Sequence, residues 1–260
     1  MLSKNKIKFI TSLKKKKHRN ESGLFLAEGA KLVNEILFSG FHVSLLCATP
    51  EWRNASNHNH QANIKELIMI TQKELNRIST HKTPDQVLAV VEKPNYEIKE
   101  QELIHNLSLV LDSINDPGNL GTIIRIGDWF GIYNIICSHS TVDVYNPKVI
   151  QSTMGSICRV KVHYQDIKEM LSKYHKISNF GIYGSFLEGE NIYKTELSNK
   201  GFIVMGNEAH GISNELMPYI DNKLYIPNYA EKSGYIPESL NVSVATGIIC
   251  SEFRRREGIK

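Results

Sequence analysis

From residue 104 onward the chain alternates short apolar runs with longer amphipathic segments, and this alternation limits the fold more than any other feature. Apolar runs of four or five residues are typical of strands that are buried on both faces. Strands separated by helices predict an α/β domain built on a parallel sheet, with helices on both faces. We expect strands at 107–111, 134–137, 181–185, 201–205 and 223–226, and helices at 119–130, 146–154, 165–175, 213–219 and 240–256.

The stretch 109–131, LVLDSINDPGNLGTIIRIGDWFG, is the first candidate for a functional segment. It predicts a buried strand, a tight turn at 116–119 and a helix that Asn119 can cap. Arg125 lies about one and a half turns into that helix, at roughly 100° per residue. Both side chains are expected to face a ligand beyond the end of the strand, where open α/β sheets bind ligands. The alternative is an ordinary strand–turn–helix with a solvated arginine.

Two later stretches complete a pattern. The first is FIVMGNEAHGIS at 202–213, and the second is Ile226-Pro227 followed by SLNVSVA at 239–245. In order, the three motifs are D-P-x-N-x-G-x-x-x-R, then G-x-E-x-x-G-[IL]-S, then I-P with S-L-N-V-S-V-A. Together they resemble the signature motifs of the SpoU (TrmH-like) branch of the SPOUT RNA ribose methyltransferases. The resemblance implies that residues 104–260 form a SPOUT catalytic domain with a deep trefoil knot, which periodicity alone cannot show.

Residues 1–95 predict a smaller α/β module that begins with a basic arm. The pattern Phe25-x-x-Glu28-Gly29 and the run TPDQVLAV at 83–90 resemble the RNA substrate-binding domain that many SpoU enzymes carry. Residues 3–19 predict one basic helix, and the first twenty residues hold seven lysines and no acid. A run of this kind is either a solvated tail or a contact for RNA phosphates, and the neighbouring motifs favour RNA.

The resemblance also implies the catalytic residues. The residue that matches the family's ribose-activating arginine is Arg125. Because the pKa of arginine lies far above neutrality, we expect Arg125 to steer a phosphate or stabilise the alkoxide rather than act as a base. We expect Glu208 to pair with that guanidinium, Asn119 to orient the ribose or Arg125, and Ser239 and Asn241 to lie at the active centre. The alternatives are a loop carboxylate at 208 and simple helix capping at 239 and 241.

The methyl donor that the resemblance implies is S-adenosyl-L-methionine. No G-x-G-x-x-G loop stands in a strand–helix context, which argues against a Rossmann-type site. The positions that match the family's donor site are Gly206, Ile226 and Leu240. Ribose methylation needs no metal, because the sulfonium of the donor is already electrophilic. Residues 228–238 form a longer connection than is usual in the family, and the alternatives for this insertion are a reshaped donor pocket or an added stacking surface for RNA.

Composition is compatible with this interpretation. A net charge of +4 and a pI near 8.7 permit RNA binding without demonstrating it. The absence of a long apolar stretch or a C-x-x-C pair predicts a cytoplasmic protein with no membrane span, and with reduced core cysteines. The pair His58 and His60 is expected to be a surface loop rather than a metal site.

The overall prediction is a homodimeric RNA 2′-O-ribose methyltransferase whose substrate is ribosomal RNA rather than tRNA, since an RNA-recognition domain is present. Two alternatives differ from it in chemistry. One is a catalytically silent RNA-binding paralogue, which the full set of site residues disfavours. The other is a SPOUT enzyme that methylates a base nitrogen, for which a carboxylate base is the more typical arrangement.

Overall fold

The structure is a computed structural model that describes residues 2–55, 63–230 and 239–256. The chain divides into two compact units. An N-terminal unit holds residues 1–95 together with 143–159, and a C-terminal unit holds 96–142 and 160–260. That the segment 143–159 belongs to the N-terminal unit could not be read from the sequence pattern.

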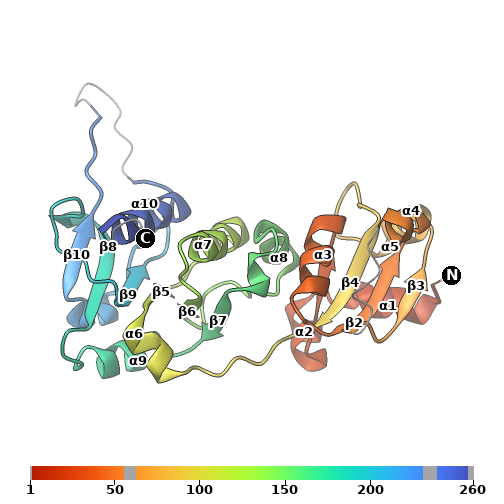
Figure 1. Ribbon diagram of the computed structural model, residues 1–260, viewed down its shortest axis with the longest axis horizontal. Helices are drawn as coiled ribbons and strands as arrows, with labels where there is room; N and C mark the ends of the chain where they lie inside the picture. The colour runs from red at the N-terminus through yellow and green to blue at the C-terminus, as the bar shows by residue number, and fades with distance from the viewer. Residues whose placement is uncertain (1, 56–62, 231–238, 257–260) are drawn as a thin grey trace. The chain divides into compact units, whose positions relative to one another are not determined.

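The N-terminal unit is built on a four-stranded sheet with the strand order β1-β4-β2-β3. Figure 1 labels β4, β2 and β3 of this sheet side by side. Strand β4 runs antiparallel to both of its neighbours, whereas β2 and β3 are parallel. Apolar side chains of the sheet pack against Ile10, Leu13 and Leu75 from the helices. The elements are α1 (Lys4–Ser12), α2 (Lys16–Ser22), β1 (Leu24–Glu28), α3 (Ala30–Phe38), β2 (Val43–Ala48), α4 (Pro50–Ala55), β3 (Leu67–Met69), α5 (Gln72–Ile78) and β4 (Val87–Glu92).

The basic arm forms two helices, α1 and α2, so the prediction of a single helix over 3–19 is wrong. The break is held by Arg19, whose side chain is only 2% exposed. Its guanidinium donates to the carbonyls of Leu13 and Lys14 at 3.0 and 2.9 Å, and its Nη2 lies 2.6 Å from Asp143 Oδ2. A buried charge must be paired to be tolerated. Arg19 is therefore a structural residue rather than part of an exposed basic surface.

The segment 143–159 carries α8 (Pro147–Ser152) and a short 3₁₀ turn. The ring of Tyr145 lies 4.9 Å from the ring of Phe25 in β1. Arg159 Nη1 lies 2.7 Å from Glu35 Oε2 in α3. These contacts, together with the Arg19–Asp143 pair, account for the assignment of this segment to the N-terminal unit.

The C-terminal unit is a six-stranded, fully parallel sheet with the strand order β10-β8-β9-β5-β6-β7. This confirms the predicted α/β class. The elements are α6 (Glu100–His105), β5 (Leu107–Leu111), α7 (Pro117–Trp129), β6 (Asn134–Cys137), β7 (Lys161–Tyr164), α9 (Ile167–Tyr174), β8 (Gly181–Asn191), β9 (Gly201–Met205), β10 (Asn222–Tyr225) and α10 (Val242–Arg256).

Three elements of this unit differ from the prediction. Strand β7 was not expected, because its sequence KVHY is short and half polar. The segment expected as a helix at 213–219 is a 3₁₀ helix at Asn214–Tyr219 with Pro218 inside it. A proline cannot donate the backbone hydrogen bond that an α-helix needs. Strand β8 continues to Asn191 and pairs irregularly with β10.

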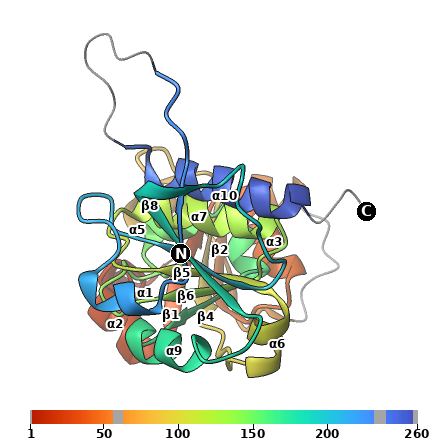
Figure 2. The same cartoon turned by 90° about the vertical axis from the view of Figure 1, so that its left-hand side faces the viewer.

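Helices cover both faces of the parallel sheet. Figure 2 shows α7 and α10 along one face and α6 and α9 along the other. On the second face Leu103 of α6 and Leu171 of α9 pack against Val110, Phe202 and Val204 of the sheet. In sheets covered in this way, ligands bind beyond the carboxyl ends of the strands.

The four cysteines are free thiols, as expected. Burial raises the pKa of the Cys47 and Cys250 thiols to about 12 in each case, so both remain protonated near neutral pH. A thiol is a nucleophile only as the thiolate. Over the ranges that the structure describes, no helix is long and apolar enough to cross a membrane.

Candidate active site

The predicted site lies at the edge where the parallel strands end. Asp112 follows β5, Gly206 follows β9 and Ile226 follows β10. Because parallel strands end at the same edge of a sheet, the loops after these strands gather there. The backbone N–H of Asp112 donates to the carbonyl of Met205 at 2.9 Å, which joins two of the loops directly.

The sequence suggested Asn119 as the N-cap of α7, but the residue that caps this helix is Asp116. Asp116 Oδ1 accepts a hydrogen bond from the backbone N–H of Asn119 at 2.8 Å, and Pro117 occupies the first turn. Proline is favoured there because its missing N–H would have no partner in any case. Capping by Asp116 leaves the side chain of Asn119 available for other contacts.

Three of the predicted residues form a continuous chain of hydrogen bonds, which we call the amide relay: Asn241, Asn119 and Glu208. Asn241 Oδ1 accepts from the backbone N–H groups of Ser243 and Val244 at 2.9 and 3.4 Å, at the start of α10. Asn241 Nδ2 donates to Asn119 Oδ1 at 3.0 Å. Asn119 Nδ2 donates to Glu208 Oε1 at 2.8 Å.

The direction of the relay is fixed by its first member. A backbone N–H can only donate, so Asn241 must present its oxygen to α10 and its amide nitrogen to Asn119. Asn119 must then present its own nitrogen to Glu208, which has to accept. The relay ends on an exposed carboxylate, and within the described ranges no donor reaches its other oxygen. That oxygen is free to accept a hydrogen bond from a ligand.

Arg125 is not part of this cluster. Its side chain is exposed, and no hydrogen bond or ion pair joins it to any described residue. The expected charge pair with Glu208 is absent from the described residues, and Glu208 Oε1 is bound to Asn119. Six residues separate Asn119 from Arg125, so the two lie about 120° apart around the helix and about 9 Å apart along it. The expectation that Asn119 orients Arg125 is therefore not met in this structure.

Ser239 also stands apart from the relay. It is exposed, and among the described residues it has no hydrogen-bond partner. Leu240, the next residue, is 50% exposed, and Ile226 is partly buried after β10. Two apolar side chains are thus left incompletely covered near the carboxyl edge of the sheet.

A second set of hydrogen bonds, which sequence reasoning missed, fixes the loop after β9. Asp112 is 4% exposed, and its Oδ2 accepts from the backbone N–H of Ser213 at 2.8 Å. Asn207 Nδ2 donates to the carbonyl of Ser113 at 2.7 Å. A carboxylate directly after a buried strand and an amide beside Glu208 were the available signals. Asp112 and Asn207 position the loop that carries Glu208.

Gly206 is explained by backbone packing. The chain returns on itself through paired hydrogen bonds between Asn207 and Gly211, each 2.9 Å long. A Cβ atom at position 206 would overlap the backbone of Gly211 and Ile212. Only glycine allows this close approach. Its identity therefore does not by itself demonstrate donor binding.

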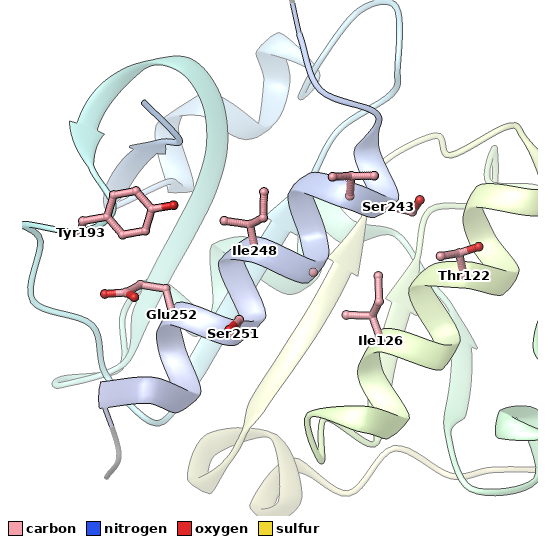
Figure 3. Close-up of a pocket in the computed structure, with 9 residues that line it drawn as sticks. Thr122, Ile126, Tyr193, Ser243, Ile248, Ser251 and Glu252 are labelled. Carbon is pink, nitrogen blue, oxygen red and sulfur yellow. The ribbon is translucent and has the colours of Figure 1, made fainter. Parts of the chain in front are cut away.

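A pocket between α7 and α10 adjoins the relay (Figure 3). Thr122 and Ile126 line it from α7, and Ile248 lines it from α10. Ser243 also lines it, and its Oγ donates to Asn241 Oδ1 at 2.6 Å. The pocket is therefore continuous with the first member of the relay.

No group of three or more His, Cys, Asp or Glu side chains in the described residues could hold a metal ion. His58 and His60 lie outside those residues. Within the long connection, Tyr229 is 81% exposed, and residues 231–238 lie outside the described part.

Comparison with known proteins matches residues 106–251 to the SpoU rRNA Methylase family and residues 4–89 to the MRM3-like substrate binding domain. The chain is 29% identical, over 96% of both chains, to the 23S rRNA (guanosine(2553)-2'-O)-methyltransferase RlmP of Bacillus subtilis (strain 168). A Porphyromonas gingivalis structure described as of the TrmH family is 37% identical, with a TM-score of 0.86, covering 98% of this chain and 99% of that one. The AdoMet-bound rRNA methyltransferase of Sinorhizobium meliloti is 28% identical, with a TM-score of 0.82, covering 100% and 97%.

We predict that Gly206→Ala destabilises the fold whether or not a ligand is present. The added methyl group would meet backbone atoms, which cannot move aside cheaply, so the free energy of unfolding should fall by about 1–3 kcal/mol. Urea titration followed by circular dichroism measures this. Gly247→Ala is the matched control, because its Cβ would meet only Ile126 Cδ1, at an ordinary 3.6 Å. Equal stability of the two variants would contradict the packing role of Gly206.

Proposed function

The chain belongs to the SpoU rRNA methylase family, and from that premise we propose that it methylates a ribose 2′-hydroxyl of ribosomal RNA with S-adenosyl-L-methionine as the donor. The relatives named above support ribosomal RNA as the substrate class, since two of them are named as rRNA methyltransferases. The domain at 4–89, matched to a substrate-binding domain, supports the same choice over tRNA.

The observation that carries the proposal is the amide relay. A ribose hydroxyl is a poor nucleophile, so catalysis requires that the hydroxyl be oriented and the charge that develops on it be stabilised. Asn119 and Asn241 are held in fixed orientations, and Glu208 is left with one free carboxylate oxygen. We assign Glu208 and the two asparagines to orientation of the ribose, and Ser239 to the same exposed edge.

Arg125 takes the role of a charge-stabilising group in this proposal. It is free of protein partners in the described residues and carries a planar guanidinium, which suits a phosphate or a developing alkoxide. The lack of an ion pair between Arg125 and Glu208 in the described residues supports direct action on the RNA rather than action through the carboxylate. A literal role as general base is disfavoured by the high pKa of arginine.

The donor site is proposed at Gly206, Ile226 and Leu240. The partly covered side chains of Ile226 and Leu240 fit the apolar surface of an adenine, and Gly206 follows β9 as Ile226 follows β10, at the same edge of the parallel sheet. When bound, the donor supplies an electrophilic methyl group on a sulfonium, so the reaction requires no metal.

Other parts of the proposal rest on the family. They are a cytoplasmic location, a deep trefoil knot in a catalytic domain spanning 104–260, and RNA recognition by the module at 1–95. The fully parallel sheet and the match over residues 106–251 support the catalytic assignment.

We also propose that the chain is a homodimer that associates through α7 and α10. On this face Val244 is 51% exposed and Trp129 is 85% exposed. Ile126 and Ile248 line the pocket between the two helices. An apolar face of this kind is costly to leave in water, which supports its burial against a second copy.

Arg125→Ala should leave folding and donor binding near normal and slow methyl transfer by about 10²–10³, the usual cost of removing one preorganised charge-stabilising group. Arg125→Lys should also be slow, because an ammonium cannot reproduce the planar fork. Single-turnover transfer of a tritiated methyl group to unmodified 23S rRNA, at saturating donor, measures the chemical step. Lys176→Ala, an exposed cation after α9, is the control and should react as wild type does. Transfer by Arg125→Ala within a few-fold of wild type would contradict the assigned role.

Sedimentation velocity at micromolar concentration should give a particle of twice the 29.5 kDa mass of one chain. Val244→Asp should produce monomers, since it places a charge in the proposed interface. Because Val244 is 51% exposed, the substituted chain should fold as the wild type does. Leu187→Asp, at a position 70% exposed in β8, is the matched control and should stay dimeric. A monomeric wild type, or a dimeric Val244→Asp, would contradict this interface.

A further inference from the structure

The polar loop before β4, residues 79–86, is held more firmly than an ordinary connection. Glu28, at the end of β1, is 9% exposed and accepts hydrogen bonds from the hydroxyls of Ser79 and Thr80 and from the backbone N–H of Thr80. Asp85 Oδ2 accepts from the backbone N–H of Ala30 at 3.2 Å. Glu28 therefore holds the beginning of the loop by hydrogen bonds, and Asp85 holds its end.

Further contacts fix the middle and the exit of the loop. Gln72 Nε2 donates to the carbonyl of Pro84 at 3.1 Å, and the backbone N–H of Thr49 donates to the carbonyl of Gln86 at 2.9 Å. Gln86 adopts φ +52°, which is uncommon for a residue with a side chain. Surface loops with few apolar side chains are usually mobile. The number of hydrogen bonds that hold this polar loop in one conformation therefore suggests that the conformation serves a function.

The loop is surrounded by cations. Lys14 Nζ donates to the carbonyl of Ser79 at 2.7 Å, which brings the basic arm against the loop. Lys82 is exposed, three residues along the loop, and Arg77 is exposed in the last turn of α5. Neither has an ion-pair partner among the described residues. Lys15 and Lys16 continue the exposed charge beyond Lys14.

Two carboxylates belong to this region. Glu28 is 9% exposed and is bonded to Ser79 and Thr80, whereas Asp85 is exposed and accepts from the backbone N–H of Ala30. The exposed cations Lys14, Arg77 and Lys82 outnumber Asp85, so the exposed charge on this rigid loop is positive on balance. A polyanion with regularly spaced charges is the partner that such a surface fits, and no exposed aromatic side chain of the loop offers a platform for bases.

We propose that the loop 79–86, with Lys14, Arg77 and Lys82, is the surface by which the N-terminal unit binds the phosphodiester backbone of the substrate RNA, and that Glu28 is its positioning residue. This inference rests on the proposed function, because it identifies where that RNA is bound. It predicts contacts that depend on charge and position but not on base sequence.

The test uses the full-length chain and unmodified 23S rRNA in a filter-binding assay, at salt concentrations from about 50 to 200 mM. The variant K14A/K82A should lower the slope of log affinity against log salt by about 1.4–1.8, or about 0.7–0.9 for each lost phosphate contact. The matched control is K4A/K65A. Lys4 and Lys65 are exposed and lie near the Lys6–Glu66 pair, at the other end of α1. The control should keep the wild-type slope.

Glu28→Gln provides a second variant, since its amide nitrogen would face the donors that now bind a carboxylate. It should weaken RNA binding and lower the salt slope while binding of S-adenosyl-L-methionine is unchanged. A merely structural role would lower the unfolding temperature without changing the slope. Glu28→Asp, which keeps the charge, should restore part of the affinity.

The possible results distinguish a failure of the proposed RNA-binding surface from a failure of the proposed function. If K14A/K82A keeps the wild-type slope while the wild type binds and methylates rRNA, the surface is not the RNA site and a protein partner becomes the alternative occupant. If the wild type binds no rRNA at any salt concentration, the proposed function fails and the surface with it. A lower slope in both double variants would show general charge neutralisation and would also contradict the assignment.

Discussion

The direction of the hydrogen bonds at the start of α10 determines the rest of the candidate site. Two backbone N–H groups bind Asn241 Oδ1, and every later orientation follows from that first contact. The nitrogen of Asn241 meets Asn119, and the nitrogen of Asn119 meets Glu208. The same side chain of Asn241 therefore caps α10 and sets the orientation of Asn119. The capping alternative for Asn241 is correct, and it does not exclude a catalytic role.

The parallel sheet supplies the second constraint. It brings the loops after β5 and β9 to one edge, where Asp112 binds the backbone of Ser213. The Asp112 side chain is only 4% exposed, so breaking this contact would leave its Oδ2 without a protein donor at a site with little access to water. Gly206 permits the sharp return of the same loop. Glu208 therefore lies on a loop whose backbone is held by close packing at Gly206, and its carboxylate is held by a hydrogen bond from Asn119.

Sequence reasoning reached the parallel α/β class, because apolar runs and amphipathic segments alternate over the whole C-terminal unit. It also selected Asn119, Glu208 and Asn241, which the structure brings together. It could not show that Arg125 makes no hydrogen bond or ion pair with them, since that depends on the rotation of α7 after Asp116 caps it. It missed Asp112, because one carboxylate after a strand has no spacing that marks it. The packing of 143–159 with the N-terminal unit depends on long-range contacts such as Arg19–Asp143, which periodicity does not contain.

The relay can be broken without removing the cap, and this provides the most direct test of its role. Asparagine and aspartate cap helices about equally well, so Asn241→Asp should fold like the wild type. The aspartate has no N–H to donate to Asn119 Oδ1. Asn119 should then turn its amide nitrogen toward the aspartate, which removes the hydrogen bond from Asn119 to Glu208. Single-turnover methylation of unmodified 23S rRNA should then be slower by at least about tenfold, with donor binding retained. If Asn241→Asp transfers the methyl group at the wild-type rate, the relay does not orient the ribose and the account of the site is wrong.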